Sequence, residues 1–212
     1  VIVLFLLNLF VGSVDIPARD VIDILLGDDT HGAAGFIVTG SRLPMAVTAL
    51  LAGAGLAVSG LMLQTSFRNP LAGPSILGIT SGASLGVALV LLFFGGSVAI
   101  GTLTIGGYAA VILGAFVGSM LMMGVLLGLS TLLRNDLMLL ITGIMMGYLA
   151  SSLIMLLNYA STAEGVQNYV MWGMSSFNGV SLQQLPLFAG VTLAGIFLSL
   201  LLIKPLNVML LG

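Results

Sequence analysis

The stretch IGGYAAVILGAFVGSMLMMGVLLGLSTLL, Ile105–Leu133, contains no charged side chain and is long enough to cross a membrane as a helix. It belongs to a longer segment without Asp, Glu, Lys or Arg that runs from Asn69 to Leu133. At about 20 residues per helical crossing, this segment holds two or three membrane spans. The sequence therefore predicts an integral membrane protein.

The composition of the whole chain supports this prediction. Of 212 residues, 59% are hydrophobic and 6% are charged, and the mean hydropathy is +1.25. Soluble globular domains carry about 25% charged residues, so this chain lacks the polar side chains to cover its surface in water. The net charge of −2 provides no basic patch for nucleic acid, and the absence of cysteine excludes disulfides and thiolate metal sites.

We predict an all-α fold, a polytopic transmembrane helical bundle that forms a single domain over residues 1–212. Continuously apolar segments favour helices over the alternating strands of a β-barrel. The six predicted helices are Val1–Gly12, Pro44–Phe67, Ile76–Phe94, Ile105–Leu133, Leu137–Tyr159 and Leu185–Ile203. The first is short, and we expect a truncated membrane helix there because a signal peptide would need a charged lead-in and a cleavage site.

Basic residues predict the orientation in the membrane. Arg68, Arg134 and Lys204 follow the second, fourth and sixth segments, whereas Arg19 and Arg42 lie on the opposite side with most of the acids. The positive-inside rule then places the Arg68 side in the cytoplasm. We expect a multi-pass protein of the inner (plasma) membrane with a cytoplasmic N-terminus.

Two stretches outside the spans are expected on the external face, each with a surface helix. One lies in Ser13–Ser41, where Pro17 suits a helix start and Gly27 a helix stop. The other lies in Ser161–Gln184 and covers Glu164–Trp172, whose aromatic end suits the lipid headgroup layer.

No ionisable residue other than tyrosine lies within a predicted span. Ion-coupled carriers and proton pumps usually need such residues in the membrane, so we expect the energy for transport to come from another protein. The only lysine, Lys204, precedes Pro205, and the sequence contains no phosphate-binding Gly-x-x-x-x-Gly-Lys-Ser/Thr loop. His31, the one histidine, lies in a glycine-rich loop. We therefore predict no catalytic residue, metal site or cofactor in this chain.

Small residues recur at four-residue spacing, which places them on one helix face and lets helices approach closely in lipid. Gly78, Gly82 and Gly86 form one such series. Further pairs are Gly114 with Gly118, Gly124 with Gly128, and Gly143 with Gly147. We favour internal packing over a subunit interface for each pair. The intervening hydroxyls of Thr80, Ser81 and Ser84 either line a weakly polar path or hydrogen-bond between helices.

The segment RNPLAGPSILG, Arg68–Gly78, lies between apolar runs and contains two prolines and two glycines. Such a segment does not form a continuous helix. We predict a cytoplasmic turn that dips back toward the membrane and contains Arg68, Asn69, Pro70, Leu71 and Ala72.

Motifs distributed along nearly the whole chain are specific enough to indicate a family. They are RLPMAVTALLAGAGLAVSGLMLQ (Arg42–Gln64), RNPLA (Arg68–Ala72), SGASLG (Ser81–Gly86), LITGI (Leu140–Ile144), WGMSSF (Trp172–Phe177) and KPLNVMLLG (Lys204–Gly212). Together they resemble the FecCD family, the permeases of ABC importers for iron–siderophores, haem and cobalamin. The RNPLA block after a Ser-Gly-x-x-x-Gln helix end is the most specific of these motifs.

The resemblance implies about ten membrane helices per subunit, of which about six are present here. We therefore expect a chain truncated at the C-terminus, before the cytoplasmic helix pair that contacts the ATPase, and also at the N-terminus. The implied partners are a second permease subunit, in a homodimer or a heteromeric pair, two cytoplasmic ATPases that bind ATP and Mg²⁺, an external substrate-binding protein and membrane lipid.

The resemblance also implies roles for individual residues. Leu137–Tyr159 corresponds to the fifth family helix, which lines the translocation pathway, and Glu164–Phe177 to the short helix at its outer mouth. The pathway and gate candidates are Thr142, Gly143, Met146, Ser151, Asn158, Glu164 and Trp172. Arg42 matches the first arginine of an Arg-Leu-Pro-Arg motif that receives acids of the binding protein. Met45 replaces the second arginine, so docking is expected to be weaker or to use Arg19.

The predicted function is therefore a permease subunit, not an enzyme, of an ATP-driven importer for an iron chelate or cobalamin. The alternative is a secondary carrier or channel energised by an ion gradient, which a dependence on a transported ion would favour. A membrane enzyme has little support, because no cluster of Asp, Glu, His or Ser lies within the spans. The sequence does not identify the solute.

Overall fold

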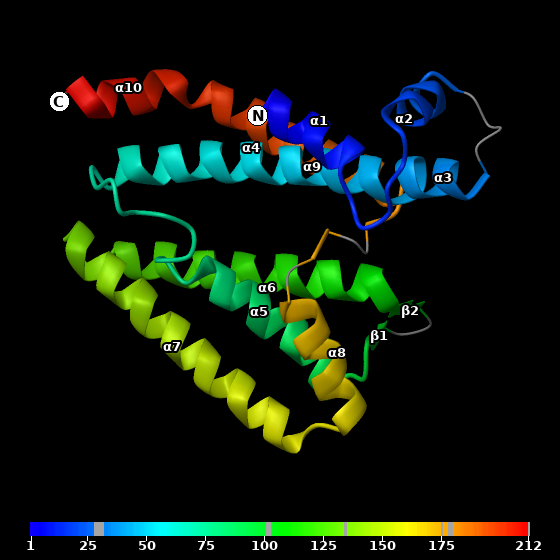
Figure 1. The fold of residues 1–212 in the computed structure, drawn as a ribbon. Coiled ribbons are helices and arrows are strands. Elements are labelled where there is room, and N and C mark those ends of the chain that lie inside the picture. The colour runs from blue at the N-terminus through cyan, green and yellow to red at the C-terminus, as the bar shows by residue number, and fades with distance from the viewer. Residues whose placement is uncertain (28–31, 101–102, 134, 175, 178–179, 212) are drawn as a thin grey trace. The chain divides into compact units, whose positions relative to one another are not determined.

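The computed structural model describes residues 1–212 except 28–31, 101–102, 134, 175, 178–179 and 212. Arg134 and His31, considered above for orientation and metal binding, lie outside the described residues. The described chain is predominantly helical, which confirms the all-α class (Figure 1). It divides into two compact units, Val1–Leu61 with Ser176–Gly212, and Met62–Ser175. The single domain stays a prediction.

The first unit contains the two ends of the chain. Its helices are α1 (Ile2–Phe10), α2 (Ala18–Leu25), α3 (Gly32–Ile37), the π-helix η2 (Val38–Arg42), α4 (Leu43–Ser66, which ends in the second unit), α9 (Leu185–Leu201) and α10 (Ile203–Leu211). Ile16, Val21, Ile24 and Val38 form a small buried cluster against which Phe10 packs. This cluster joins the predicted surface helix, here α2, to α1 and η2.

The second unit carries the helices that build the candidate site. Its elements are α5 (Ile79–Ala88), the π-helix η3 (Leu89–Phe93), β1 (Ser97–Ile100), β2 (Leu103–Gly106), α6 (Gly107–Ser130), α7 (Asp136–Ala160) and α8 (Ala163–Gly173). In Figure 1, α5 lies beside α6, and α8 lies near the end of α5. A buried cluster of Ala72, Leu77, Leu126 and Leu140 joins the start of this unit to α6 and α7.

A short antiparallel hairpin, β1–β2, separates η3 from α6, a feature that the sequence reading did not include. Ser97 pairs with Gly106 and Ile100 with Leu103. Gly95, Gly96 and Gly107 have positive φ angles, which glycine adopts without a steric penalty. The glycines predicted to interrupt the apolar run thus flank a chain reversal, and α6 begins at Gly107 instead of Ile105.

The helix that contains Pro44 begins earlier than the sequence reading predicts. We expected a span that starts at Pro44, but a helical segment runs from Gly32 to Ser66. Pro44 donates no hydrogen bond to the carbonyl of Gly40, and its ring would crowd that carbonyl in a regular α-helix. The π-helical turn η2, Val38–Arg42, directly precedes the proline and widens the backbone there. The helix therefore accommodates Pro44 without a break.

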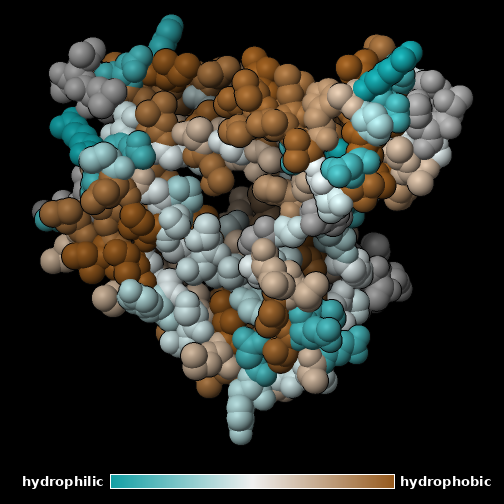
Figure 2. All heavy atoms as spheres, in the orientation of Figure 1, coloured by the Kyte–Doolittle hydropathy of each residue, from teal (hydrophilic) through white to brown (hydrophobic). Residues whose placement is uncertain are grey.

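The described helices include three that are long and apolar enough to cross a membrane: Gly32–Ser66, Gly107–Ser130 and Leu137–Ala160. Two shorter apolar helices are Ile79–Phe93 and Leu185–Leu201. Large hydrophobic side chains remain exposed along these helices, as Figure 2 shows in brown. Lipid-facing helices require such a surface, whereas a soluble protein would bury much more of it.

Candidate functional site

Helix α5 contacts its neighbours at glycines. A Cβ atom added to Gly82 would lie 2.7 Å from the carbonyl oxygen of Gly118 on α6, and one on Gly86 would overlap the carbonyl of Gly114. Gly78, the N-cap of α5, faces α7, where a Cβ would lie 2.7 Å from the carbonyl oxygen of Gly143. The series Gly78, Gly82 and Gly86 therefore lies at contacts between helices of one unit.

A cavity of about 290 Å³ lies between α5, α7 and α8 and is lined by hydroxyl groups. Its lining residues are Thr80, Ser81 and Ser84 of α5, Ser151 and Ile154 of α7, and Tyr169 of α8. None of these six described residues is charged. The hydroxyls of α5 sit at helical spacing beside the glycine face, so the same close approach of α5 and α7 brings them to the cavity.

Several hydroxyls of this unit form hydrogen bonds within their own segment. They donate to a carbonyl three or four residues earlier, as found for Ser119, Ser130, Thr131, Thr142, Ser151 and Ser152. Within the described part of the chain, the hydroxyls of Thr80, Ser81 and Ser84 form no hydrogen bond. Their bonding capacity is therefore available to a group in the cavity.

The start of α8 is fixed to η3, the π-helix that continues α5. The Ser161 hydroxyl donates to the carbonyl of Leu92 in η3 at 3.0 Å, and the backbone N–H of Gly165 donates to the Thr162 hydroxyl at 3.2 Å. Gly165 is buried, and a Cβ there would lie 2.6 Å from Ser161 Oγ and 3.2 Å from the carbonyl oxygen of Leu91. Tyr169 follows Gly165 by one helical turn, so these contacts also position Tyr169 at the cavity.

Tyr169 stacks on Trp172, with ring centroids 6.0 Å apart. Burial raises the pKa of the Tyr169 phenol above its ordinary value. A phenol is protonated at neutral pH and can donate a hydrogen bond. The sequence reading selected Trp172 and missed Tyr169. The available signal was the spacing of three residues, which places both aromatic rings on one face of a helix.

The predicted pathway residues do not converge on one point. Ser151 lines the hydroxyl cavity, and Gly143 packs against Leu77. Thr142 and Asn158 donate to carbonyls of their own helix, those of Met138 and Ile154. Glu164 is exposed in the first turn of α8, Trp172 stacks on Tyr169, and Met146 lines a second cavity. Their roles in a pathway stay predictions.

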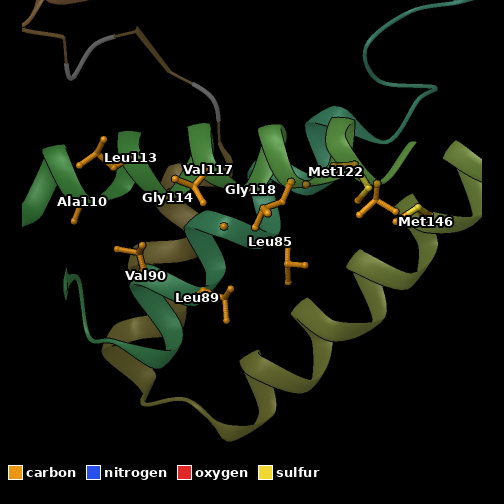
Figure 3. A pocket seen from close by; sticks show the side chains of 14 residues that line it. Leu85, Leu89, Val90, Ala110, Leu113, Gly114, Val117, Gly118, Met122 and Met146 are labelled. Carbon is orange, nitrogen blue, oxygen red and sulfur yellow. The ribbon is translucent and has the colours of Figure 1, made fainter. Parts of the chain in front are cut away.

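This second cavity, of about 490 Å³, has an almost entirely apolar lining. In Figure 3, Leu85 and Leu89 of the α5–η3 segment lie across it from Val117 of α6, and Met146 of α7 lies at one end. Such a lining offers no hydrogen bond to a polar solute. The hydroxyl cavity is therefore the better candidate for contact with one.

Arg42, a predicted docking residue, is only 4% exposed. Its guanidinium donates to the carbonyl of Leu9 at 3.0 Å, to that of Phe10 at 3.4 Å and to that of Val14. These carbonyls lie at and beyond the end of α1, where no N–H group of the helix remains to donate to them. Arg19 is 91% exposed along its side chain and lies 4.0 Å from Asp23. The docking role of both arginines stays a prediction.

The predicted turn at Arg68–Ala72 breaks the helix as expected. Helix α4 ends at Ser66, and Arg68 has a φ angle of 46°, which closes the helix. The side-chain oxygen of Asn69 accepts the N–H of Leu71 at 3.0 Å, and the Asn69 carbonyl accepts the N–H of Ala72. Ala72 is buried, whereas Leu71 is 74% exposed. The turn is thus anchored at one end and presents Leu71 outward.

Comparison with known proteins yields one family and several relatives. The model of the FecCD transport family matches residues 1–212. The hemin transport permease HmuU of Yersinia pestis is 31% identical over 100% of the chain and 62% of that protein. The vitamin B12 import permease BtuC of Klebsiella pneumoniae is 36% identical over 81% of the chain and 49% of that protein.

Two further matches extend this set. The molybdate import permease MolB of Haemophilus influenzae is 42% identical over 64% of the chain and 38% of that protein. A solved structure of a metal-chelate type ABC transporter in an inward-facing conformation has a TM-score of 0.79 and 27% identity, over 100% of the chain and 62% of that structure. The chain therefore spans between 38% and 62% of the lengths of these proteins.

Proposed function

Because the chain belongs to the FecCD transport family, we propose that it is part of the transmembrane permease subunit of an ATP-driven importer. The family match over residues 1–212 is the observation that carries this proposal. The ATP and Mg²⁺ bind a separate ATPase, because this chain contains no phosphate-binding loop. The permease itself is not an enzyme. The alternative of an ion-driven carrier is not favoured, since the named relatives are permeases of import systems.

In this proposal the chain works within a larger assembly. Two permease subunits face each other in the inner membrane, two ATPases bind their cytoplasmic side, and an external binding protein delivers the solute. The N-terminus and the turn Arg68–Ala72 lie in the cytoplasm, and the binding protein docks near Arg19 and Arg42. The absence of charged residues from Asn69 to Leu133 supports the proposal, because the spans within that segment contain no charged group that would couple transport to an ion.

We propose a solute from the range of the named relatives. The sequence motifs predict an iron chelate, such as a siderophore or haem, or cobalamin. The molybdate permease among the relatives adds oxyanions to that range. Molybdate, haemin and cobalamin are therefore the three probes for uptake by intact cells that produce the whole transporter.

The partner ATPase provides the most direct test. The tagged permease, purified from its own membranes under native conditions, is expected to bring with it a protein that carries a phosphate-binding loop, identified by mass spectrometry. A matched purification from cells that express an unrelated tagged membrane protein serves as the control. Recovery of the permease without any ATPase, together with no uptake of the three probes, would contradict the proposed function.

A further inference from the structure

We infer that the apolar cavity along α6 is a groove that holds one acyl chain of a membrane phospholipid. The inference goes beyond the transport role proposed above and depends on neither the solute nor the ATPase. Four features of the groove carry it: the way in which α5 and α6 form it, its apolar lining, its narrow width, and its place along a candidate membrane span.

The groove exists because α5 and α6 approach each other at glycines. A Cβ atom on Gly86 would overlap the carbonyl of Gly114, so the two backbones meet with no side chain between them. The floor of the groove is therefore bare backbone. Larger side chains stand on either side of it, Leu85 and Leu89 from the α5–η3 segment and Val117 from α6 (Figure 3).

The lining selects a hydrocarbon. Each of the fourteen described residues that line the groove is a glycine, alanine, valine, leucine or methionine, and none of their side chains donates a hydrogen bond. A buried water needs two to four polar partners, so the groove stays dry. A polar or charged solute would lose its hydration there without compensation.

The width of the groove favours a single chain over a helix. Ala110 and Val125 are the first and last residues of α6 in the lining, and they lie about 22 Å apart at 1.5 Å per residue. A volume of about 490 Å³ over that length gives an average cross-section of about 22 Å². A helix with its side chains is about 10–12 Å wide, which corresponds to roughly 80–110 Å². An unbranched hydrocarbon chain, one methylene group wide, fits where a helix does not.

The position of the groove explains how a lipid chain reaches it. Helix α6 is long and apolar enough to cross a membrane, and the groove is shorter than the roughly 30 Å of hydrocarbon in a bilayer. Two side chains of its α6 wall are open to the surface, since Val117 is 52% exposed and Leu121 is 65% exposed. The chain therefore enters from the side, within the hydrocarbon layer.

Close packing retains the chain, because bulk lipid is as apolar as the groove. An empty groove would leave the atoms that line it without dispersion contacts on one side. A flexible hydrocarbon chain supplies those contacts. The preference for the groove over bulk lipid is therefore modest, and the bound chain exchanges with the bilayer.

The test uses the whole transporter, permease with ATPase, in phospholipid vesicles that contain a small fraction of phosphatidylethanolamine with a photoreactive diazirine in one acyl chain. Peptide mass spectrometry after irradiation measures the lipid attached to Leu85 and Leu89, on the α5–η3 wall. Leu121→Trp fills the groove from the opposite wall. We expect it to lower this labelling about fivefold, which corresponds to a preference of about 1 kcal/mol over bulk lipid. Leu89→Trp, which fills the groove from the other side, should lower the labelling of Val117 in the same way.

Met120→Trp is the matched control, because Met120 neighbours Leu121 on α6 and is 59% exposed but does not line the groove. It should leave the labelling unchanged. Equal labelling of Leu85 and Leu89 in Leu121→Trp and Met120→Trp would overturn the inference, because contact with bulk lipid alone gives that result. No labelling of these leucines in the unmodified transporter would overturn it as well and would show that protein covers the groove. Both results leave the importer function in place, since uptake and the ATPase partner test that function separately.

Discussion

The carbonyls of Leu9, Phe10 and Val14 lie at and just beyond the end of α1, and the Arg42 guanidinium donates hydrogen bonds to all three. Carbonyls at a helix end that lack a donor are costly where they are buried, and Arg42 itself is only 4% exposed, so this side chain stabilises the first unit. Gly12 makes the arrangement possible, because a Cβ there would lie 2.6 Å from the guanidinium. Arg42, which the sequence predicts for docking, therefore has a structural role within the first unit.

Arg42→Met should therefore destabilise the protein. The substitution retains much of the aliphatic stem but leaves the three carbonyls without donors, which we expect to cost about 2–3 kcal/mol. Thermal unfolding of the purified transporter measures this as a lower Tm. Arg19→Met, at an exposed position, is the control and should leave the Tm unchanged. A docking role alone would produce the opposite pattern, with weaker capture of the binding protein and an unaltered Tm.

At the scale of the elements, the contacts between α5, α6 and α7 depend on glycine. Helices in lipid gain no hydrophobic stabilisation from association, so close packing supplies much of the attraction. The backbones of α5 and α6 meet at Gly82, Gly86, Gly114 and Gly118, where a side chain would overlap the facing carbonyl or Cα. The close approach of α5 to α6 therefore depends on these four positions.

Gly86→Ala should disrupt this contact, because the added methyl would overlap the Gly114 carbonyl backbone, which cannot rotate away. Overpacking of this kind costs about 1–3 kcal/mol or more. The measurement is the yield of monodisperse protein and its Tm in detergent. Gly124→Ala on α6 is the matched control, since nothing lies within 4 Å of a Cβ there. Equal stability of the two variants would show that α5 and α6 do not pack as described.

A single side-chain hydrogen bond also holds the start of helix α8 against η3. The Ser161 hydroxyl is bonded to the carbonyl of Leu92, and a neutral hydrogen bond contributes about 1 kcal/mol. Ser161→Ala should therefore speed amide hydrogen exchange in Ala163–Gly173 by roughly fivefold, with little change in α6. Ser152→Ala, which removes a hydroxyl bonded only to its own helix, should leave the exchange of α8 as it is.

At the scale of the whole molecule, two of the three candidate spans among the described helices, Gly107–Ser130 and Leu137–Ala160, contain no charged residue. Such helices form a path but do not by themselves supply energy for uphill transport. We therefore expect uptake by the whole transporter to stop when the ATPase is inactivated by substitution of its phosphate-loop lysine. Collapse of the proton and sodium gradients, with ATP maintained, should leave uptake intact. The reverse pattern would support an ion-driven carrier.

The sequence by itself determined the class of the protein, the family, and most of the helices. Ile105–Leu133 and Leu137–Tyr159 could be located because a chain segment without charge must satisfy its backbone groups internally in lipid, which a helix does locally. The helix break at Arg68–Ala72 was predictable for a similar reason, since proline and glycine act on the backbone next to them. The hydroxyls of Thr80, Ser81 and Ser84 were visible as a weakly polar group.

Only the tertiary structure decided how these local features combine. The sequence does not show that Tyr169 lines one cavity with the α5 hydroxyls, that Gly86 faces Gly114, or that Arg42 donates hydrogen bonds to the end of α1. The β1–β2 hairpin and the passage of the helix through Pro44 also depend on backbone pairing and on a π-helical turn, not on hydropathy. Each arises from contacts between residues distant in the chain or from a compensation between neighbouring turns. Hydropathy and residue spacing describe one segment at a time, so they predict neither the contacts between distant residues nor the compensation between neighbouring turns.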